Sequence, residues 1–406
     1  MPQLFDVAIV GAGAAGMMCA AVAAQRGQRV VLIDHGKKLA EKIRISGGGR
    51  CNFTNLHTTP NNFLSQNPHF CKSALARYTP QDFLALMARY RIAYHEKHKG
   101  QLFCDHSAED IIRMLKAECD VGGVHWRMEC KINAVAKTAD GAFLLETSDG
   151  PMQANSLVIA TGGLSIPAIG ATDFAFGIAR QFGLKIIEPR PALVPLTFDA
   201  ASWQTFVPLA GIALVVEVET GVKKERGFFR EDLLFTHRGL SGPAILQISS
   251  FWQSGAPITL NLLPELDATA ALLEAKGSSK KNLANILGQW LPKNLVEGWC
   301  NANGFALEAR VADLPDKTLR ALGESLNRWR VVPNGSEGYK KAEVTRGGID
   351  TRELSQQSMM ANKVPGLHFI GEAVDVTGWL GGFNFQWAWA SGMAAGLAVG
   401  QTSSPD

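Results

Sequence analysis

The chain has 406 residues, of which 46% are hydrophobic and 19% are charged, and its formal net charge at pH 7 is +3. A chain of this length is expected to form roughly two or three domains, and a charge so close to neutral argues against electrostatic binding of nucleic acid. The seven cysteines are scattered and include no C-x-x-C pair, which argues against a disulfide framework and a zinc site. Without a signal-peptide pattern or an apolar run of about 20 residues, we expect a cytoplasmic protein with no membrane span and no metal.

The N-terminal segment predicts a strand, a glycine-rich turn, a helix and a second strand, in that order. The apolar run 6–10 leads into Gly11-Ala-Gly13-Ala-Ala-Gly16, an Ala- and Met-rich stretch follows to Ala24, and the strand 29–33 closes on Asp34. This order is typical of the dinucleotide-binding fingerprint, in which phosphates lie on the helix N-terminus and the acid binds an adenosine ribose. The candidate ligands of this segment are Gly11, Gly13, Ala14, Ala15, Gly16, Asp34 and His35.

A second glycine-rich segment is Ser46-Gly-Gly-Gly-Arg-Cys-Asn52. Three consecutive glycines fit neither a helix interior nor the centre of a strand, so this segment predicts a loop whose backbone closely approaches another group. Its cysteine, Cys51, has no cysteine beside it and is interpreted as a packed thiol rather than a redox centre.

The next elements are helices that begin at Thr79 and Ser107, where capping patterns precede apolar periodicity. Between them, His95 and His98 have the i, i+3 spacing of one helix face, and we interpret them as a solvated face because too few ligands are present for a metal. Strands are predicted over 130–135, 142–147 and 156–160, and the last ends in Ala160-Thr161-Gly162-Gly163.

The character of the sequence changes near Pro189, where prolines mark a linker. Alternating apolar stretches then predict an antiparallel β unit, residues 266–330 read as helical, and a strand returns at 366–370. The first and last parts of the chain are therefore predicted to form one sheet domain (1–190 and 345–406), into which residues 191–344 are inserted.

The C-terminal strand ends in Gly371-Glu372, and Asp375 follows. An acid at a strand end can accept hydrogen bonds from sugar-alcohol hydroxyls such as the ribityl chain of a flavin. The segment Gly381-Gly-Phe-Asn384 opens a helix rich in small residues, which are expected to let it pack close to the sheet. The start of this helix is predicted to face a flavin, where its dipole would stabilise negative charge.

These segments resemble the glutathione-reductase-like FAD superfamily. More narrowly, Ile45–Asn55, Phe235–Pro243 and Gly381–Gln386 resemble the BaiN/RdsA family of NAD(P)/FAD-dependent oxidoreductases, over about residues 5–396. The resemblance implies noncovalent FAD on a Rossmann-type α/β domain. It also implies an insertion with a β-barrel part (191–265 and 331–344) and a small helical part (266–330). Many members carry a basic residue and a Phe-Pro pair where this chain has Gln101-Leu-Phe103-Cys104, so no relative's substrate is carried over.

The resemblance implies that the second glycine-rich segment wraps the flavin, with glycine N–H donors, Arg50 on a phosphate and Asn52 on the ring system. The further candidate cofactor ligands are Lys42, Ser46, Gly47, Gly48, Gly49, Arg50, Cys51, Asn52, Thr161, Gly162, Gly371, Glu372, Asp375, Gly381, Gly382, Phe383 and Asn384. For His237 and Arg238 two readings remain open: a proton donor or anion clamp over the flavin, or a pair that stabilises a turn.

The sequence thus predicts an FAD-dependent oxidoreductase that moves hydride through flavin N5 to or from a small organic substrate, with NADH or NADPH as transient reductant. One alternative is a flavin oxidase that acts on a small amine with oxygen. Another is a flavin-binding protein with an RNA-related or sensory role. A nucleic-acid partner is not expected from the charge.

Overall fold

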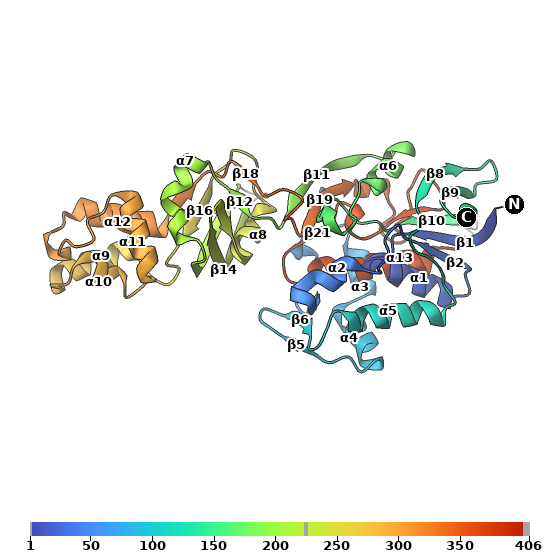
Figure 1. Ribbon diagram of the computed structural model, residues 1–406, viewed down its shortest axis with the longest axis horizontal. Helices are drawn as coiled ribbons and strands as arrows, with labels where there is room; N and C mark the ends of the chain where they lie inside the picture. The colour runs from blue at the N-terminus through green and yellow to red at the C-terminus, as the bar shows by residue number, and fades with distance from the viewer. Residues whose placement is uncertain (1, 223–225, 401–406) are drawn as a thin grey trace. The chain divides into compact units, whose positions relative to one another are not determined.

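The computed structural model describes residues 2–222 and 226–400 (Figure 1). The chain divides into two compact units: unit 1 is Met1–Arg190 with Val344–Asp406, and unit 2 is Pro191–Glu343. Residues 401–406, which the sequence analysis assigns to the first domain, lie outside the described residues.

Unit 1 is built on a seven-stranded sheet whose central strands are parallel. The order is β7-β2-β1-β10-β9-β8, and β20 pairs with the C-terminal half of β10. β7, β2, β1, β10 and β20 run parallel, whereas β9 and β8 are antiparallel additions at one edge. The strands are β1 (Gln3–Val10), β2 (Val30–Ile33), β7 (His125–Arg127), β8 (Ile132–Lys137), β9 (Phe143–Thr147), β10 (Gly150–Ile159) and β20 (Leu367–Phe369).

Helices and small sheets surround this sheet. The helices are α1 (Ala14–Gln25), α2 (Glu41–Ile45), α3 (Lys72–Arg77), α4 (Pro80–Arg89), α5 (Glu109–Val121), α6 (Phe174–Gln181) and α13 (Phe383–Ala398). The small sheets are β3 (Asn52–Asn55) with β6 (Gln101–Cys104) and β5 (Tyr94–Glu96), β4 (Phe63–Leu64) with β21 (Thr377–Gly378), and β11 (Ile186–Ala192) with β19 (Val344–Ile349). The predicted capping box at Thr79 is present, because its hydroxyl and the Asp82 carboxylate satisfy each other's backbone N–H groups.

Two local predictions in unit 1 are wrong. His95 lies in strand β5 and His98 in the turn after it, because Lys99 and Gly100 adopt left-handed φ angles of 51° and 76° that close a hairpin. The small residues of α13 pack on a helix rather than on the sheet. A Cβ on Gly392 would lie 2.6 Å from the Ala15 carbonyl oxygen, and one on Gly396 would lie 2.9 Å from that of Cys19, both in α1.

Unit 2 contains an antiparallel seven-stranded sheet in the order β17-β16-β13-β14-β15-β12-β18. In the described residues, the end strands β17 and β18 each pair with one neighbour. The strands are β12 (Leu196–Thr197), β13 (Ala213–Thr220), β14 (Gly227–Thr236), β15 (Gly239–Ser241), β16 (Ile258–Asn261), β17 (Trp329–Val331) and β18 (Gly335–Ser336).

The helices of unit 2 are α7 (Ala200–Trp203), α8 (Pro243–Ser249), α9 (Ala268–Ser278), α10 (Leu283–Leu287), α11 (Lys293–Asn303) and α12 (Asp316–Asn327). Helix α8 was not predicted; it interrupts the β part because Pro243 occupies its first turn, where a missing N–H costs nothing. An aromatic cluster holds the sheet to the helical segment, since Trp329 packs on Trp203, Phe206 and Trp299.

Candidate cofactor site

The carboxyl ends of β1, β2, β10 and β20 meet at one edge of the unit 1 sheet. Backbone hydrogen bonds join these ends: Gly11 N donates to Ile33 O (2.8 Å), Ala160 N to Val10 O (2.8 Å) and Ile370 N to Ile159 O (3.1 Å). The predicted residues Gly11, Asp34, Thr161 and Gly371 lie one or two positions after these strand ends, so the fold brings them together. Open α/β sheets bind their ligands at such an edge.

The three fingerprint glycines occupy different environments. A Cβ on Gly16 would lie 1.9 Å from the Gly11 carbonyl oxygen, and a Cβ on Gly11, where φ is +107°, would lie 2.5 Å from the Ala160 carbonyl oxygen. Gly13 differs, because no atom of the described chain lies within 4 Å of the place its Cβ would take. The contacts of the protein with itself therefore require Gly11 and Gly16 but leave clear space beside Gly13.

The space beside Gly13 fits a dinucleotide pyrophosphate. Gly13 is the N-cap of α1, and no side chain caps this helix end in the described residues. Its first turn, which includes Ala14 and Ala15, thus offers backbone N–H donors and the positive end of the helix dipole. An anion at this point would meet donors without a side chain in the way.

The Asp34 carboxylate already accepts two hydrogen bonds from backbone N–H groups of the protein. One carboxylate oxygen accepts from Ala12 N (2.7 Å) and the other from Gly36 N (2.7 Å), so the side chain braces the glycine turn. Each oxygen retains a further lone pair, which leaves room for the predicted ribose contact. His35 is half exposed, and its Nε2 would lie 2.9 Å from a Cβ on Gly170.

The second glycine-rich segment is a tight turn in which the three glycines are left-handed. The φ angles of Gly47, Gly48 and Gly49 are 57°, 66° and 85°, and Cys51 also has a positive φ of 48°. A Cβ on Gly47 would lie 2.9 Å from the Phe103 ring, whereas Gly48 and Gly49 face open space. Ser46 donates to Ile43 O (2.8 Å), and Arg50 is exposed.

The structure joins this segment to the glycine loop before α13, although more than three hundred residues separate them. Asn55 Nδ2 donates to Gly381 O (3.0 Å), and Thr54 Oγ1 donates to Gln386 Oε1 (2.6 Å). The Asn52 amide, in the orientation that satisfies both of its polar atoms, accepts from Gly382 N (3.2 Å) and donates to Leu102 O (3.2 Å). The two predicted glycine loops are therefore neighbours.

The loop before α13 is held by its own side chains. Asn384 accepts from Gly378 N (2.8 Å) and donates to Gly378 O (2.9 Å), and the Phe383 ring packs edge-on against Phe63 and Trp379. These contacts fix the N-terminus of α13, so Phe383 and Asn384 shape the loop, and the cofactor contacts predicted for them stay predictions.

Glu372 lies in a polar cluster that the sequence does not predict. Its carboxylate accepts from Lys42 Nζ (2.5 Å), Ser165 Oγ (2.9 Å) and Thr345 N (2.9 Å), and Lys42 also donates to Ser165 Oγ (2.6 Å). Lys42 and Glu372 were both candidate ligands, and the structure pairs them with each other. Ser165 and Thr345 were missed, because no local pattern links residues so far apart in sequence.

Two other candidates are buried in different ways. The Asp375 carboxylate accepts from Gln66 N (2.8 Å), and burial raises the pKa of this acid above its ordinary value.

The Thr161 hydroxyl is buried and has no hydrogen-bond partner in the described part of the chain. Gly162 beside it has a φ of +73° and faces open space. A buried hydroxyl without a partner beside clear space fits a polar group of a cofactor.

His237 and Arg238 lie in unit 2, in the tight turn between β14 and β15. The Arg238 side chain is 72% exposed, its Nη1 lies 3.8 Å from Glu337 Oε1, and Thr236 Oγ1 donates to Gly239 O (2.9 Å) across the turn. These contacts involve Arg238 and the turn but not His237, so both readings, a role over the flavin and a turn-stabilising pair, stay predictions.

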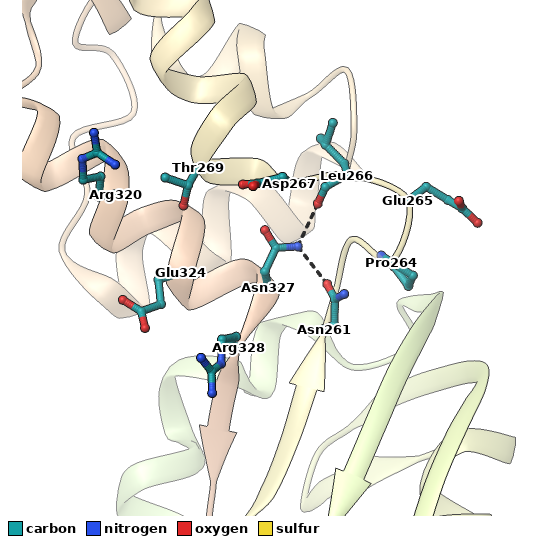
Figure 2. Close-up of a pocket in the computed structure, with 10 residues that line it drawn as sticks. All are labelled: Asn261, Pro264, Glu265, Leu266, Asp267, Thr269, Arg320, Glu324, Asn327 and Arg328. Carbon is teal, nitrogen blue, oxygen red and sulfur yellow. Dashed lines mark hydrogen bonds between the residues drawn. The ribbon is translucent and has the colours of Figure 1, made fainter.

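A wide groove of about 730 Å³ in unit 2 contains none of the candidate residues (Figure 2). It lies beside β16, α9 and α12. Asn327 at its centre is fully used by the fold, since its amide donates to Asn261 Oδ1 (2.9 Å) and Leu266 O (2.9 Å) and accepts from Ala268 N (2.8 Å). Asn327 therefore links the end of β16 to the segment before α9, and its amide is used by the fold.

We also searched the described residues for metal-binding groups, disulfides and membrane-spanning helices. They contain no group of three or more His, Cys, Asp or Glu side chains placed to hold a metal. All seven cysteines are buried and free of disulfides. None of the described helices has the length and apolar character needed to cross a bilayer.

Comparison with known proteins gives matches along nearly the whole chain. The family model described as "HI0933-like protein Rossmann domain" matches residues 5–398. The chain is 52% identical over 395 residues to the ribosomal RNA dihydrouridine synthase of Escherichia coli strain K12, and the match covers 97% of each protein. It is 47% identical over 403 residues to the Haemophilus influenzae protein of the same name, covering 98% of this chain and 99% of the relative.

A more distant relative has a different name. The chain is 24% identical over 413 residues to the 3-dehydro-bile acid delta(4,6)-reductase of Clostridium scindens, and the match covers 97% of this chain and 99% of that protein.

Proposed function

Because this chain belongs to the HI0933-like family of Rossmann-fold, flavin-dependent oxidoreductases, we propose that it reduces uridine to dihydrouridine in ribosomal RNA. The observation that carries the proposal is the 52% identity to a ribosomal RNA dihydrouridine synthase over 97% of both proteins. The predicted family and the predicted enzyme class are confirmed by these matches.

The chemistry of the proposed reaction suits a flavoprotein. Dihydrouridine differs from uridine by one hydrogen on each carbon of the C5–C6 bond, which corresponds to a hydride and a proton. FAD supplies the hydride chemistry when it is bound, and the protein supplies binding and orientation. We propose NADH or NADPH as the source of the electrons.

The residues that we propose to hold FAD come from both ends of the chain. The N-terminus of α1 and the clear space at Gly13 would hold the pyrophosphate, and Asp34 would contact the adenosine ribose. The unpartnered Thr161 hydroxyl and the linked loops at Gly47–Gly49 and Gly381–Gly382 would contact the rest of the cofactor.

This proposal departs from two expectations of the sequence analysis. The expected small organic substrate is replaced by an RNA nucleoside, and the expectation that nucleic acid is not a partner is set aside. A formal charge of +3 describes the whole chain and does not describe how basic residues gather on one surface.

The test uses the FAD-loaded protein and ribosomal RNA from cells that lack its gene. With NADPH or NADH under anaerobic conditions, we expect nucleosides from the treated RNA to contain a species heavier than uridine by two hydrogens. RNA incubated without the nicotinamide is the control. Reduction of the flavin without any dihydrouridine in the RNA would overturn the proposal, and rapid peroxide formation from small amines would favour the oxidase.

The small-molecule reading is the second candidate, and the bile-acid reductase supports it. That relative is named for the reduction of carbon–carbon double bonds, and the match covers 97% of this chain. Re-oxidation of the reduced flavin by a steroid enone, but not by RNA, seen as the return of its visible absorbance under anaerobic conditions, would select this reading.

A further inference from the structure

The hairpin formed by β5 and β6 exposes a basic segment, residues 91–103, which we call the basic hairpin. It contains Arg91, Lys97 and Lys99 against a single acid, Glu96, so it carries a net +2 where the whole chain carries +3. Glu96 is exposed and accepts a hydrogen bond from Gly100 N (2.8 Å) across the turn. The segment is therefore net positive, and the nearby Asp105 carboxylate lies 2.7 Å from His95 Nδ1.

The basic hairpin is open to solvent. Residues 93–99 are all exposed, and β5 pairs only with β6 in the described part of the chain. The register places His95 opposite Phe103 and Glu96 opposite Leu102. An exposed edge strand with lysines is accessible to a large partner.

Aromatic rings alternate with the charges. Tyr94 is 42% exposed, the His95 ring stacks on Phe103 with centroids 6.1 Å apart, and Lys97 Nζ lies 5.7 Å from the Phe103 centroid. Basic side chains that follow a phosphate backbone, with rings on which bases stack, are characteristic of surfaces that bind single-stranded nucleic acid.

The inner strand of the hairpin touches both glycine loops of the candidate cofactor site. The Phe103 ring lies 2.9 Å from the place a Cβ on Gly47 would take, and Gln101 Cδ lies 3.0 Å from that of Gly381. A strand bound on the hairpin would therefore run beside the site. An enzyme that acts on a base must take that base out of its stack, which favours a binding surface next to the chemistry.

We propose that the basic hairpin binds the RNA strand that contains the reacting uridine. Lys97 and Lys99 contact phosphates, and Tyr94 and His95 offer faces on which neighbouring bases stack. This inference rests on the proposed function, since it names the surface that recognises the proposed substrate.

The test measures binding of a short fluorescein-labelled oligouridine to the FAD-loaded protein by fluorescence anisotropy. For Lys97→Glu/Lys99→Glu we expect a Kd raised about 10- to 100-fold at low salt, and a slope of log K against log salt that is shallower by about 1.4. The matched control is Lys280→Glu/Lys281→Glu, which reverses two adjacent exposed lysines of unit 2 and is expected to bind like the wild type. Equal losses in both variants would show a general charge effect and overturn the proposal.

A second variant separates binding from folding. Lys97→Gln/Lys99→Gln removes the charges without adding acids, and we expect about half of the loss in log K with unchanged flavin absorbance and melting temperature. Wild-type affinity in both hairpin variants would overturn the inference. If the variants lose RNA binding but the wild type forms no dihydrouridine, the hairpin is confirmed as an RNA site and the proposed function fails. If dihydrouridine forms and the hairpin variants bind normally, only the hairpin inference fails.

Discussion

The two glycine-rich turns of unit 1 use the same residue for different physical reasons. In the turn 11–16, Gly11 and Gly16 have backbone atoms of the protein where a side chain would be, and only Gly13 faces clear space. In the turn 47–49, all three glycines have left-handed φ angles, and two of them face clear space. The first turn needs glycine mainly because the chain packs on itself, and the second mainly because its backbone has an unusual conformation.

This difference teaches how to separate folding from cofactor binding. A substitution that meets protein atoms affects the fold whether or not FAD is present. A substitution whose side chain enters clear space changes the free energy of unfolding little, but it weakens the binding of a cofactor that occupies that space. Substitutions at Gly16, Gly13 and Gly48 test this distinction, in order of decreasing expected effect, and labelling of Cys51 then tests the chemistry of the second turn.

The largest effect is expected for Gly16→Ala. Its Cβ would lie 1.9 Å from the Gly11 carbonyl oxygen and 3.2 Å from the Ala160 Cβ, so the turn must move away from the sheet. We expect a loss of about 3 kcal/mol or more in the free energy of unfolding, seen as a fall of roughly 6–12 °C in the melting temperature of the apoprotein. A melting temperature equal to that of the wild type would show that the packing argument is wrong for this turn.

Gly13→Ala is the matched change in the same turn, and its main effect is expected on FAD. Gly13 has an ordinary φ of −87° and clear space for a methyl group, so the apoprotein should lose less than about 1 kcal/mol. The methyl group would occupy the space proposed for the pyrophosphate, and we expect FAD affinity to fall about 10- to 100-fold. Flavin fluorescence titration measures the affinity. Unchanged FAD binding would contradict the placement of the pyrophosphate.

Gly48→Ala tests the conformational side of the comparison. Its φ of 66° is left-handed, and an alanine there is expected to cost about 1–2 kcal/mol although no atom of the described chain obstructs the methyl group. Gly48→Asn should recover part of that loss, because asparagine tolerates the left-handed region. Thermal melting of the two variants provides the measurement. Equal losses for Ala and Asn would indicate that steric contact, rather than backbone conformation, selects glycine here.

The parts of the site that the sequence predicts are those with a local pattern. The order strand, glycine turn, helix, strand and acid between Asp6 and Asp34 follows from periodicity and glycine spacing within one short segment. The structure has β1, α1 and β2 in this order, with Asp34 hydrogen-bonded to the turn. Interactions between residues close in sequence determine these elements, so a single sequence is enough to predict them.

The parts that were missed or misread depend on contacts distant in sequence or on backbone detail. Glu372 binds Lys42 and Ser165, and single charged residues so far apart leave no pattern that pairs them. His95 and His98 were placed on one helix face from their i, i+3 spacing in the sequence, a spacing that residues of a hairpin can have as well. The turn is made by the left-handed φ angles of Lys99 and Gly100; Gly100 is a residue typical of turns, whereas lysine at the preceding position is not.

The last prediction concerns the rate at which the Cys51 thiol, which follows the second turn, reacts with an alkylating reagent. Cys51 has a φ of 48°, its side chain is fully buried, and burial raises the pKa of the thiol above its ordinary value. A raised pKa means less thiolate at any given pH, so alkylation by iodoacetamide should stay slow between about pH 7 and pH 9, where an ordinary thiol becomes steadily more reactive. Peptide mass mapping identifies the labelled cysteine, and the urea-unfolded protein is the control for full reactivity. Rapid labelling of Cys51 in the folded protein would overturn its interpretation as a packed thiol. Slow labelling would leave the second turn with its backbone donors and no reactive nucleophile of its own, so that its contribution to the site is shape and hydrogen bonding.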